Sequence, residues 1–570
     1  MSKITLTIDD QVVEVAAGTT LLDAARQVGI EIPTLCYHPD LSLHGSCRVC
    51  VVEDLNSHRL LASCVVPAGD GMKISTRSAK ARKARKMNVE LLLANHPNDC
   101  LGCDRSGSCE LQDLTYNLGL SRASVDRFAG EKRDLPLDLG GVALKRDPNK
   151  CILCGRCVRV CEEIQGLGTL EFSGRGFDSI VTTGFDLPQS EVNCAKCGQC
   201  AAVCPVGAIT EVSDIERVWA ALEDPNKHVV VQTAPTIQVS IGEEFGLEPG
   251  SVVTGRLIAA LRRLGFNQVF STEFSADLTI LEEGNEFINR IKGNKNLPHI
   301  TSCCPGWVKY AEQNYGDLLH HLSTAKSPQQ MFSTITKTYY AEQTKINAEN
   351  IFTVSIMPCT AKKYEKAREE HSDSGFQDTD AVLTTRELAR MIKEAGIDFV
   401  NLADDKYDQI MGAATGAATI FGTTGGVTEA ALRTVKEVLT GEPLDKLNLG
   451  IMGVREAEVE IADRTYKVAV ISGLANAAKV LNDVRAGQSE YDWIEIMACP
   501  HGCVGGGGQP IPADLEVKKK RAEGLAKIDQ TNTIRKSHEN VDVLRVYEEY
   551  LGEPLSGKSH HLLHTSYRVR

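Results

Sequence analysis

The chain has 570 residues, and its net charge of −13 argues against nucleic acid or an anionic membrane as the main partner. The length predicts roughly three to five domains, and a hydrophobic content of 42% is enough to bury several cores. No apolar run approaches the length of a transmembrane helix, and residues 1–6 lack the core of a signal peptide. We therefore expect a cytoplasmic protein with no membrane span.

Residues 3–8 alternate like a β-strand, residues 12–15 resemble a returning strand, and residues 21–28 predict a helix that ends at Gly29. The four cysteines that follow have the long gap, close pair and distant fourth ligand of a plant-type 2Fe–2S ferredoxin. A zinc site with four cysteine ligands is the alternative. The four residues are Cys36, Cys47, Cys50 and Cys64.

Residues 75–95 predict a helix with a basic, solvated face, which leads into a group of one histidine and three cysteines. Such a group could hold structural zinc or a His-ligated 4Fe–4S cluster. Its position between two iron–sulfur-like patterns favours the cluster. The four residues are His96, Cys100, Cys103 and Cys109.

Two successive runs of C-x2-C-x2-C-x3-C are specific for a bacterial two-cluster ferredoxin domain, in which the fourth cysteine of each run ligates the other cluster. Glu162 stands where the first run usually has proline, a departure that leaves the ligands intact. One 4Fe–4S cluster is expected on Cys151, Cys154, Cys157 and Cys204, and the other on Cys194, Cys197, Cys200 and Cys161.

Five of the twenty cysteines remain beyond residue 215, and two of them, Cys303 and Cys304, are adjacent. Disulfides are rare in the cytosol, so metal ligation is the expected role of most of these cysteines. Successive side chains diverge, so two neighbours cannot easily bind one metal, and one thiol is left free for other chemistry. The other three are Cys359, Cys499 and Cys503.

Beyond residue 230, short apolar runs alternate with helix-like stretches, which predicts an α/β domain. Residues 412–426 are rich in small residues but lack a P-loop lysine, so tight packing or a loop near a buried cofactor is expected. Residues 541–550 predict a helix, and His560 and His564 are expected to be surface or packing residues. The apolar runs are residues 229–232, 268–270, 351–356, 468–471 and 493–497.

Three segments, residues 301–307, 357–365 and 495–510, resemble the signature sequences of the FeFe hydrogenases and occur in the same order. The upstream domains match the five-cluster members, and residues 1–215 are also similar to the large iron–sulfur subunit of complex I. This resemblance implies a multidomain α+β chain: a β-grasp 2Fe–2S domain (1–78), a His-ligated 4Fe–4S domain (79–125), a two-4Fe–4S ferredoxin domain (140–215), an α/β H-cluster domain (216–510) and a small-subunit-like segment (511–570).

The resemblance further implies that Cys304, Cys359, Cys499 and Cys503 hold a 4Fe–4S cubane. Cys503 would also bridge to a diiron subcluster with carbon monoxide, cyanide and dithiolate ligands, and Lys362 would donate to a cyanide. Thiolates suit such soft iron. The residues expected to line the diiron pocket are Ala234, Pro235, Gln329, Met357 and Met497.

In the same family Cys303 would relay protons, and the path to solvent would run through Glu283, Ser323, Glu286 and Arg290. Glu283, Glu286 and Arg290 are spaced to share one helix face, which alone would indicate only a solvated surface. The relay is therefore an implication of the resemblance. The resemblance also implies that the protein catalyses the reversible oxidation of H2 to protons and electrons.

Electrons would pass through one 2Fe–2S and three accessory 4Fe–4S clusters to ferredoxin or to flavin- and NAD(P)-binding iron–sulfur partner subunits. The chain has neither a G-x-G-x-x-G fingerprint nor a P-loop, so a nucleotide is expected to bind another subunit. Maturation proteins would install the diiron unit. The alternatives are a non-catalytic iron–sulfur sensor or assembly protein, and a pure electron-transfer subunit that leaves five cysteines unexplained.

Overall fold

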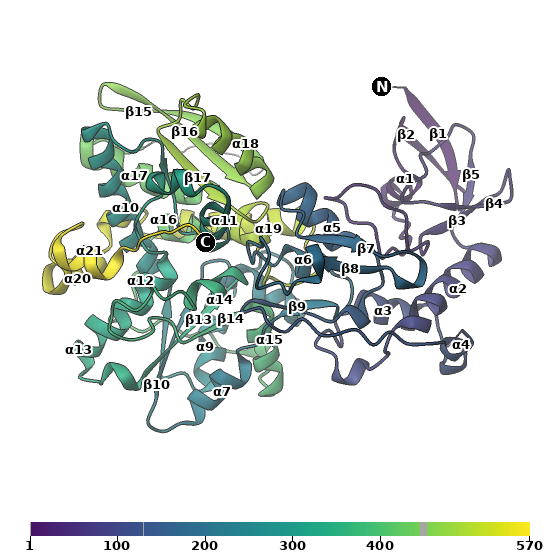
Figure 1. The fold of residues 1–570 in the computed structure, drawn as a ribbon, viewed down its shortest axis with the longest axis horizontal. Coiled ribbons are helices and arrows are strands. Elements are labelled where there is room, and N and C mark those ends of the chain that lie inside the picture. The colour runs from purple at the N-terminus through teal and green to yellow at the C-terminus, as the bar shows by residue number, and fades with distance from the viewer. Residues whose placement is uncertain (1, 129, 445–452) are drawn as a thin grey trace.

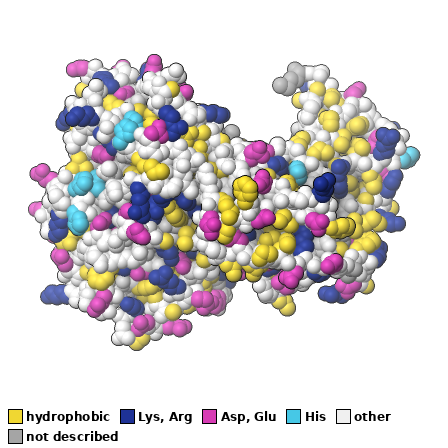
Figure 2. All heavy atoms as spheres, viewed as in Figure 1, with side chains coloured by type: hydrophobic (Ala, Val, Ile, Leu, Met, Phe, Trp, Pro, Cys, Tyr) yellow, Lys and Arg dark blue, Asp and Glu magenta, His cyan; other side chains and the backbone are white. Residues whose placement is uncertain are grey.

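The computed structural model describes residues 2–128, 130–444 and 453–570, which form two lobes joined by a ferredoxin-like module (Figure 1). The smaller lobe holds the N-terminal modules, and the larger lobe holds the two sheets of the catalytic domain together with the C-terminal segment. Figure 2 shows that the surface is hollowed between the larger lobe and the N-terminal sheet. None of the helices in the described part of the chain is long and apolar enough to cross a membrane.

The N-terminal module is a five-stranded sheet in the order β2-β1-β5-β3-β4. Its first hairpin turns at Asp9 and Asp10, both at positive φ, as a two-residue hairpin loop requires. Helix α1 (Leu21–Gln27) begins after Thr20, whose side chain accepts a hydrogen bond from the Asp23 amide. The predicted hairpin and helix are confirmed. The strands are β1 (Lys3–Ile8), β2 (Gln11–Ala16), β3 (Val51–Asp54), β4 (Arg59–Ala62) and β5 (Lys73–Ser75).

The predicted basic helix is α2 (Ala79–Asn95), which is capped by Ser78 and ends at His96. Helices α3 (Glu110–Asn117) and α4 (Arg122–Asp126) follow it. The ferredoxin-like module then contains two antiparallel strand pairs, β6 with β9 and β7 with β8. One short helix, α5, precedes β7, and another, α6, follows β8. These elements are β6 (Leu144–Arg146), α5 (Arg156–Arg159), β7 (Leu170–Ser173), β8 (Ile180–Thr183), α6 (Gln199–Val203) and β9 (Ile209–Glu211).

Two four-stranded sheets form the catalytic domain, and the predicted α/β rhythm is confirmed. The first sheet is parallel, in the order β11-β10-β13-β14, and the second has the order β12-β17-β16-β15. All five predicted apolar runs lie in strands. The strands are β10 (His228–Thr233), β11 (Gln268–Ser271), β12 (His299–Ile300), β13 (Ile351–Met357), β14 (Ala381–Thr384), β15 (Val454–Ile461), β16 (Arg464–Ser472) and β17 (Trp493–Met497).

Helices cover both sheets, and the long helix α10 (Glu273–Gly293) buries most of its side chains. It carries Glu283, Glu286 and Arg290 as one group, so their predicted helical spacing is confirmed. The other main helices are α7 (Ile215–Glu223), α8 (Ile237–Ser240), α9 (Thr254–Leu264), α11 (Pro305–Asn314), α12 (Pro328–Ile335), α13 (Ala341–Thr344), α14 (Ala361–Lys366), α15 (Thr385–Glu394), α16 (Gly416–Thr419), α17 (Gly426–Thr440) and α18 (Leu474–Arg485).

The C-terminal segment wraps the catalytic domain with helices α19 (Leu515–Thr531), α20 (Val541–Val546) and α21 (Gly557–Leu563) (Figure 1). The helix predicted near residue 541 is confirmed, whereas the polar sequence of α19 gave no signal for a helix. Arg521 of α19 is fully buried and pairs with Glu243 at 2.6 Å. His564 is buried as a packing residue, and its Nε2 lies 3.0 Å from Oε2 of Glu282.

Candidate active site

A cavity of about 90 Å³ lies where strands of both catalytic sheets end. Ala234 follows β10 and Cys359 follows β13 in the first sheet, while Cys303 follows β12 and Cys499 follows β17 in the second. The carboxyl ends of strands are the usual place for ligands in α/β folds. The paired sheets thus bring together residues from Ala234 to Cys499, segments far apart in the sequence.

All five C-terminal cysteines line this cavity, and the structure therefore assembles the three motif segments into one site. Cys304 Sγ accepts a weak hydrogen bond from the Ala498 amide at 3.4 Å. Burial and the neighbouring thiols of Cys359 and Cys304 raise the pKa of Cys503. Four clustered thiols with no disulfide among them provide the soft donor set that iron–sulfur clusters use.

Every residue expected to line the diiron pocket is found on the cavity wall: Ala234, Pro235, Gln329, Met357 and Met497, together with Lys362. The sequence did not single out several further wall residues. Phe421 and Gly422 belong to the glycine-rich stretch for which a loop near a buried cofactor was expected. Thr272 and Pro328 are the wall residues that no sequence pattern marked, whereas Pro305, Gly502 and Gly506 lie in the signature segments.

A few polar atoms on the cavity wall have spare hydrogen-bonding capacity. Lys362 Nζ donates to the Cys303 carbonyl at 3.2 Å and to Glu365 at 2.9 Å. Gln329 Oε1 and Thr236 Oγ1 are buried without a hydrogen-bond partner among the described residues. Buried polar atoms normally have partners. A largely apolar cavity that five thiols line, with the Thr236 hydroxyl and a third N–H of Lys362 left to donate, fits an iron cluster whose ligands accept hydrogen bonds.

The expected proton-relay residues lie in a connected group next to this cavity. Ser323 Oγ donates to Glu286 at 2.8 Å, and Arg290 donates to the other oxygen of Glu286 at 2.6 Å. Glu283 is buried between them and Cys303, and its charged form would raise the pKa of that thiol. The structure thus brings Cys303, Glu283, Ser323, Glu286 and Arg290 together.

Burial dominates the electrostatics of the first two relay groups. Burial, with the nearby Glu283 carboxylate, raises the pKa of Cys303 well above its ordinary value. Burial and Glu286 likewise raise the pKa of Glu283 to about 8, although the Ser323 hydroxyl lowers it. Near neutral pH both groups therefore hold protons, and the carboxyl exchanges its proton most easily.

The upstream cysteines also gather into ligand-like groups. A cavity of about 30 Å³ is lined by Cys204 together with the first three cysteines of the first run. Cys161 lies near Cys194 and Cys200 of the second run. In the N-terminal module Cys50 Sγ lies 3.3 Å from Cys64 Sγ. His96 is buried, and its Nε2 has no hydrogen-bond partner in the described ranges.

Comparison with known proteins gives a consistent result along the whole chain. The family described as the C-terminal domain of the iron-only hydrogenase large subunit matches residues 227–507, and the iron hydrogenase small subunit matches residues 515–570. A 2Fe–2S cluster-binding domain matches residues 1–79. Two iron–sulfur regions of NADH-quinone oxidoreductases match residues 85–123 and 141–210.

A protein of Solidesulfovibrio fructosivorans named NADP-reducing hydrogenase subunit HndD is 48% identical over all of both chains. The chain belongs to the FeFe hydrogenases. Iron hydrogenase 1 of Clostridium pasteurianum is 41% identical over 96% of this chain and 97% of that protein. A solved FeFe hydrogenase from Chlamydomonas reinhardtii has a TM-score of 0.58 and 41% identity, covering 63% of this chain and 99% of that one.

The protein is thus an iron hydrogenase in which 2Fe–2S and 4Fe–4S domains precede an H-cluster domain, as the sequence predicted. Its ferredoxin-like module packs directly on the catalytic site. Cys197 lies beside the residue before Cys499, since a Cβ on Gly306 would lie 3.7 Å from Cys197 Cβ and 3.2 Å from Ala498 Cβ. Gly198 has a φ of +74°, and a Cβ there would lie 2.3 Å from Thr360 Oγ1, so only glycine permits this approach.

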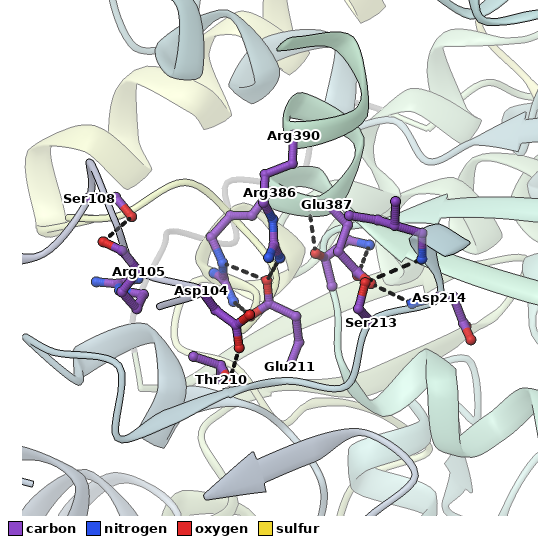
Figure 3. Close-up of polar contacts among 12 residues, drawn as sticks. Asp104, Arg105, Ser108, Thr210, Glu211, Ser213, Asp214, Arg386, Glu387 and Arg390 are labelled. Carbon is purple, nitrogen blue, oxygen red and sulfur yellow. Dashed lines mark hydrogen bonds and ion pairs between the residues drawn. The ribbon is translucent and has the colours of Figure 1, made fainter. Parts of the chain in front are cut away.

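A buried charge network holds this junction of the hydrogenase in place (Figure 3). Arg386 of α15 donates to Glu211 of β9 at 2.7 Å and to the carbonyls of Gly507 and Gln509 at 2.9 and 2.6 Å. Burial would raise the pKa of Glu211, but the guanidinium of Arg386 holds it well below its ordinary value. One arginine therefore links the ferredoxin-like module to the loop that follows Cys503.

Proposed function

We propose that Cys304, Cys359, Cys499 and Cys503 hold the cubane of the H-cluster in this hydrogenase, and that Cys303 carries protons to and from it. The single observation that carries the proposal is the cavity at the ends of both sheets, which all five thiols line. Among the five, only Cys303 has Glu283 as the ionisable neighbour with the largest effect on its pKa. The remaining four form a ligand set of the expected size.

When bound, the H-cluster supplies the redox-active iron at which H2 is split into protons and electrons or formed from them. Lys362 orients ligands at this site through its spare N–H, and Met357 and Met497 exclude water. Cys303 exchanges its thiol proton with the Glu283 carboxyl. A buried acid whose pKa lies near the pH of the medium can pass protons in either direction. Ser323 and Glu286 continue the path outward.

The electron path proposed here runs through one 2Fe–2S cluster, one His-ligated 4Fe–4S cluster and two ferredoxin-type 4Fe–4S clusters. The close approach of Cys197 to Ala498, which precedes Cys499, supports the last step, from the second ferredoxin-type cluster to the cubane. The unpartnered Nε2 of buried His96 supports its role as a ligand. The 2Fe–2S module lies at the far end of the smaller lobe, where an electron carrier can dock (Figure 1).

We further infer that the electron partners are NAD(P)-linked, flavin-containing iron–sulfur subunits, with ferredoxin as a second carrier, in the cytoplasm. The relative named as a subunit of an NADP-reducing hydrogenase matches this chain over its whole length, which supports the assignment. Co-purification of the tagged chain tests it. Recovery of a flavin-containing subunit that reduces NAD or NADP with H2 is expected, and transfer to ferredoxin alone would contradict it.

Infrared spectroscopy of the anaerobically purified protein, produced with hydrogenase maturation proteins, tests the catalytic assignment. We expect bands of metal-bound carbon monoxide and cyanide, together with H2 evolution from reduced methyl viologen. Iron analysis of the same sample reports the accessory clusters. A fully iron-loaded protein that lacks these bands would contradict the proposed site.

A further inference from the structure

His299 lies beside the relay carboxyl in the interior of the catalytic domain. Its Nε2 is 3.4 Å from Oε1 of Glu283, and the two side chains are 0% and 1% exposed. Both ring nitrogens of His299 and both oxygens of Glu283 lack a hydrogen-bond partner within the described residues. Two unsatisfied groups facing each other in a buried site require a common explanation.

The ring of His299 cannot easily turn away from Glu283. It stacks on Trp493 with ring centres 4.7 Å apart and contacts Phe287 at 5.7 Å. Its backbone is fixed as well, since the His299 amide donates to the Asp492 carbonyl at 2.8 Å and β12 pairs with β17 at Trp493. The imidazole is therefore presented to the carboxyl by a rigid aromatic cluster.

The surroundings of the ring favour one tautomer. Burial lowers the pKa of His299 well below its ordinary value, so the ring is neutral and carries one N–H. A buried N–H without an acceptor is more costly than an unpaired lone pair. Glu283 Oε1 is the acceptor that faces the ring, so the proton belongs on Nε2. Hydrogen bonds of this kind are often long without substrate and shorten during turnover.

We propose that His299 is a positioning residue of the proton relay, whose Nε2–H donates to Oε1 of Glu283 and so leaves Oε2 to take and release the mobile proton. The inference rests on the proposed relay role of Glu283. In each outward transfer Oε2 of Glu283 first passes its proton toward Ser323 and then takes the proton of the Cys303 thiol, while His299 keeps its own proton throughout.

The other groups that face Glu283 do not replace this contact. Arg290 and the Ser323 hydroxyl lower the pKa of Glu283, but the hydrogen bonds of both go to Glu286 and to backbone carbonyls. The remaining ones are acids that disfavour its ionisation. The titratable and charged neighbours are Glu286 and Arg290 on α10, Cys303 after β12, Glu495 on β17, and Tyr567 in the C-terminal tail.

The test compares His299→Leu, which removes the N–H, with His299→Gln, which keeps a donor. The control is His228→Leu. His228 lies on β10 in the other sheet, and its Nε2 is 2.9 Å from the Tyr340 hydroxyl oxygen. Two readouts are used on the holoenzyme: the pH profile of H2 oxidation with methyl viologen, and the infrared titration of the Glu283 carboxyl. The carboxyl band is identified by its loss in Glu283→Gln.

Loss of a hydrogen bond to the carboxylate raises its pKa, so in His299→Leu both readouts should move upward by about one pH unit. In His299→Gln both readouts should return most of the way to the wild-type values, because a donor is kept. His228→Leu should show no shift. Unshifted readouts in His299→Leu would overturn the role of His299. Wild-type turnover in Glu283→Gln would instead overturn the relay itself, so the two failures are distinguishable.

A measurement on the unaltered side chain covers the case in which the leucine variant does not accumulate. Nitrogen-15 spectra of histidine-labelled holoenzyme should show His299 as the neutral Nε2–H tautomer, assigned by its loss in His299→Gln. A proton on Nδ1 would overturn the proposal.

Discussion

Ser323 Oγ donates a hydrogen bond of 2.8 Å to Oε2 of Glu286. Arg290 holds the other oxygen of this carboxylate and also donates to the Leu322 carbonyl at 2.7 Å. Helix α10 and the segment after residue 321 are therefore fixed to each other at Glu286. The side chain of Glu286 is 13% exposed, so the buried part of the proposed relay ends here. These hydrogen bonds fix the exit of the proposed proton path.

Ser323→Ala should slow turnover, because it removes the hydroxyl between the two carboxyls. We expect H2 evolution from reduced methyl viologen to fall by about 10- to 100-fold, since a positioned proton carrier contributes about 10²–10⁴-fold and water replaces it in part. The carbon monoxide and cyanide bands should persist. Ser333→Ala, a buried serine that contacts Gln232 and Thr379, is the matched control. A wild-type rate in Ser323→Ala would exclude the hydroxyl from the path.

Glu283 gives the protein a specific dependence of stability on pH. Burial raises the pKa of Glu283 from 4.5 to about 8, so between these values the folded protein holds a proton that the unfolded chain has released. The contribution of this group is therefore most favourable below its unfolded pKa and is lost as pH rises through about 8. Glu283→Gln should raise the thermal midpoint relative to the wild type at about pH 9 but much less at about pH 5. An equal difference at both pH values would contradict the buried, protonated carboxyl.

The junction network predicts a separate effect on electron transfer. Arg386→Met leaves Glu211 with Arg390 as its remaining partner, and breaking a buried pair typically costs about 3–5 kcal/mol. We expect a lower thermal midpoint. Reduction of the accessory clusters by H2, followed by electron paramagnetic resonance, should be slower. Isotope exchange between H2 and deuterated water, which needs only the active site, should continue. The double variant Glu211→Gln/Arg386→Met should recover most of the stability. Unchanged cluster reduction in Arg386→Met would separate this network from electron transfer.

Gly422 is predicted to keep the diiron end of the cavity open. A Cβ at this position would lie 2.5 Å from Thr236 Cγ2 and 2.5 Å from Leu525 Cδ1. Gly422→Ala should therefore keep the thiol-held clusters but lose most of the carbon monoxide and cyanide bands. Gly293→Ala is the control. A Cβ at Gly293 would have no heavy atom within 4 Å apart from its chain neighbours and its own helix backbone. Full band intensity in Gly422→Ala would show that the cavity tolerates the methyl group.

Local patterns in the sequence were sufficient for much of this structure. The alternation in residues 3–8 and the apolar runs such as residues 351–356 predict strands because a strand exposes alternate residues or buries both faces. The spacing of the two cysteine runs predicts clusters because three ligands of each cluster come from one short run. The three site segments were recognisable only because they resemble the signature sequences of a known family.

Contacts between distant segments were not accessible in this way. His299 meets Glu283 only because β12 pairs with β17 beside α10. Tyr567 donates to the Ser323 carbonyl at 2.9 Å because the C-terminal tail returns to the relay. The polar sequence of α19 concealed a helix whose buried Arg521 is balanced by Glu243. Such positions depend on tertiary packing, and no local spacing marks them.

The division of work between Cys303 and Cys304 is the central claim, and one paired measurement tests it most directly. Cys303→Ala and Cys304→Ala are matured anaerobically, and infrared spectra and H2 turnover are recorded on the same samples. Cys303→Ala should keep the carbon monoxide and cyanide bands while turnover falls by at least about 100-fold, and Cys304→Ala should lose the cubane and the bands together. Wild-type turnover in Cys303→Ala, or intact bands in Cys304→Ala, would contradict the account.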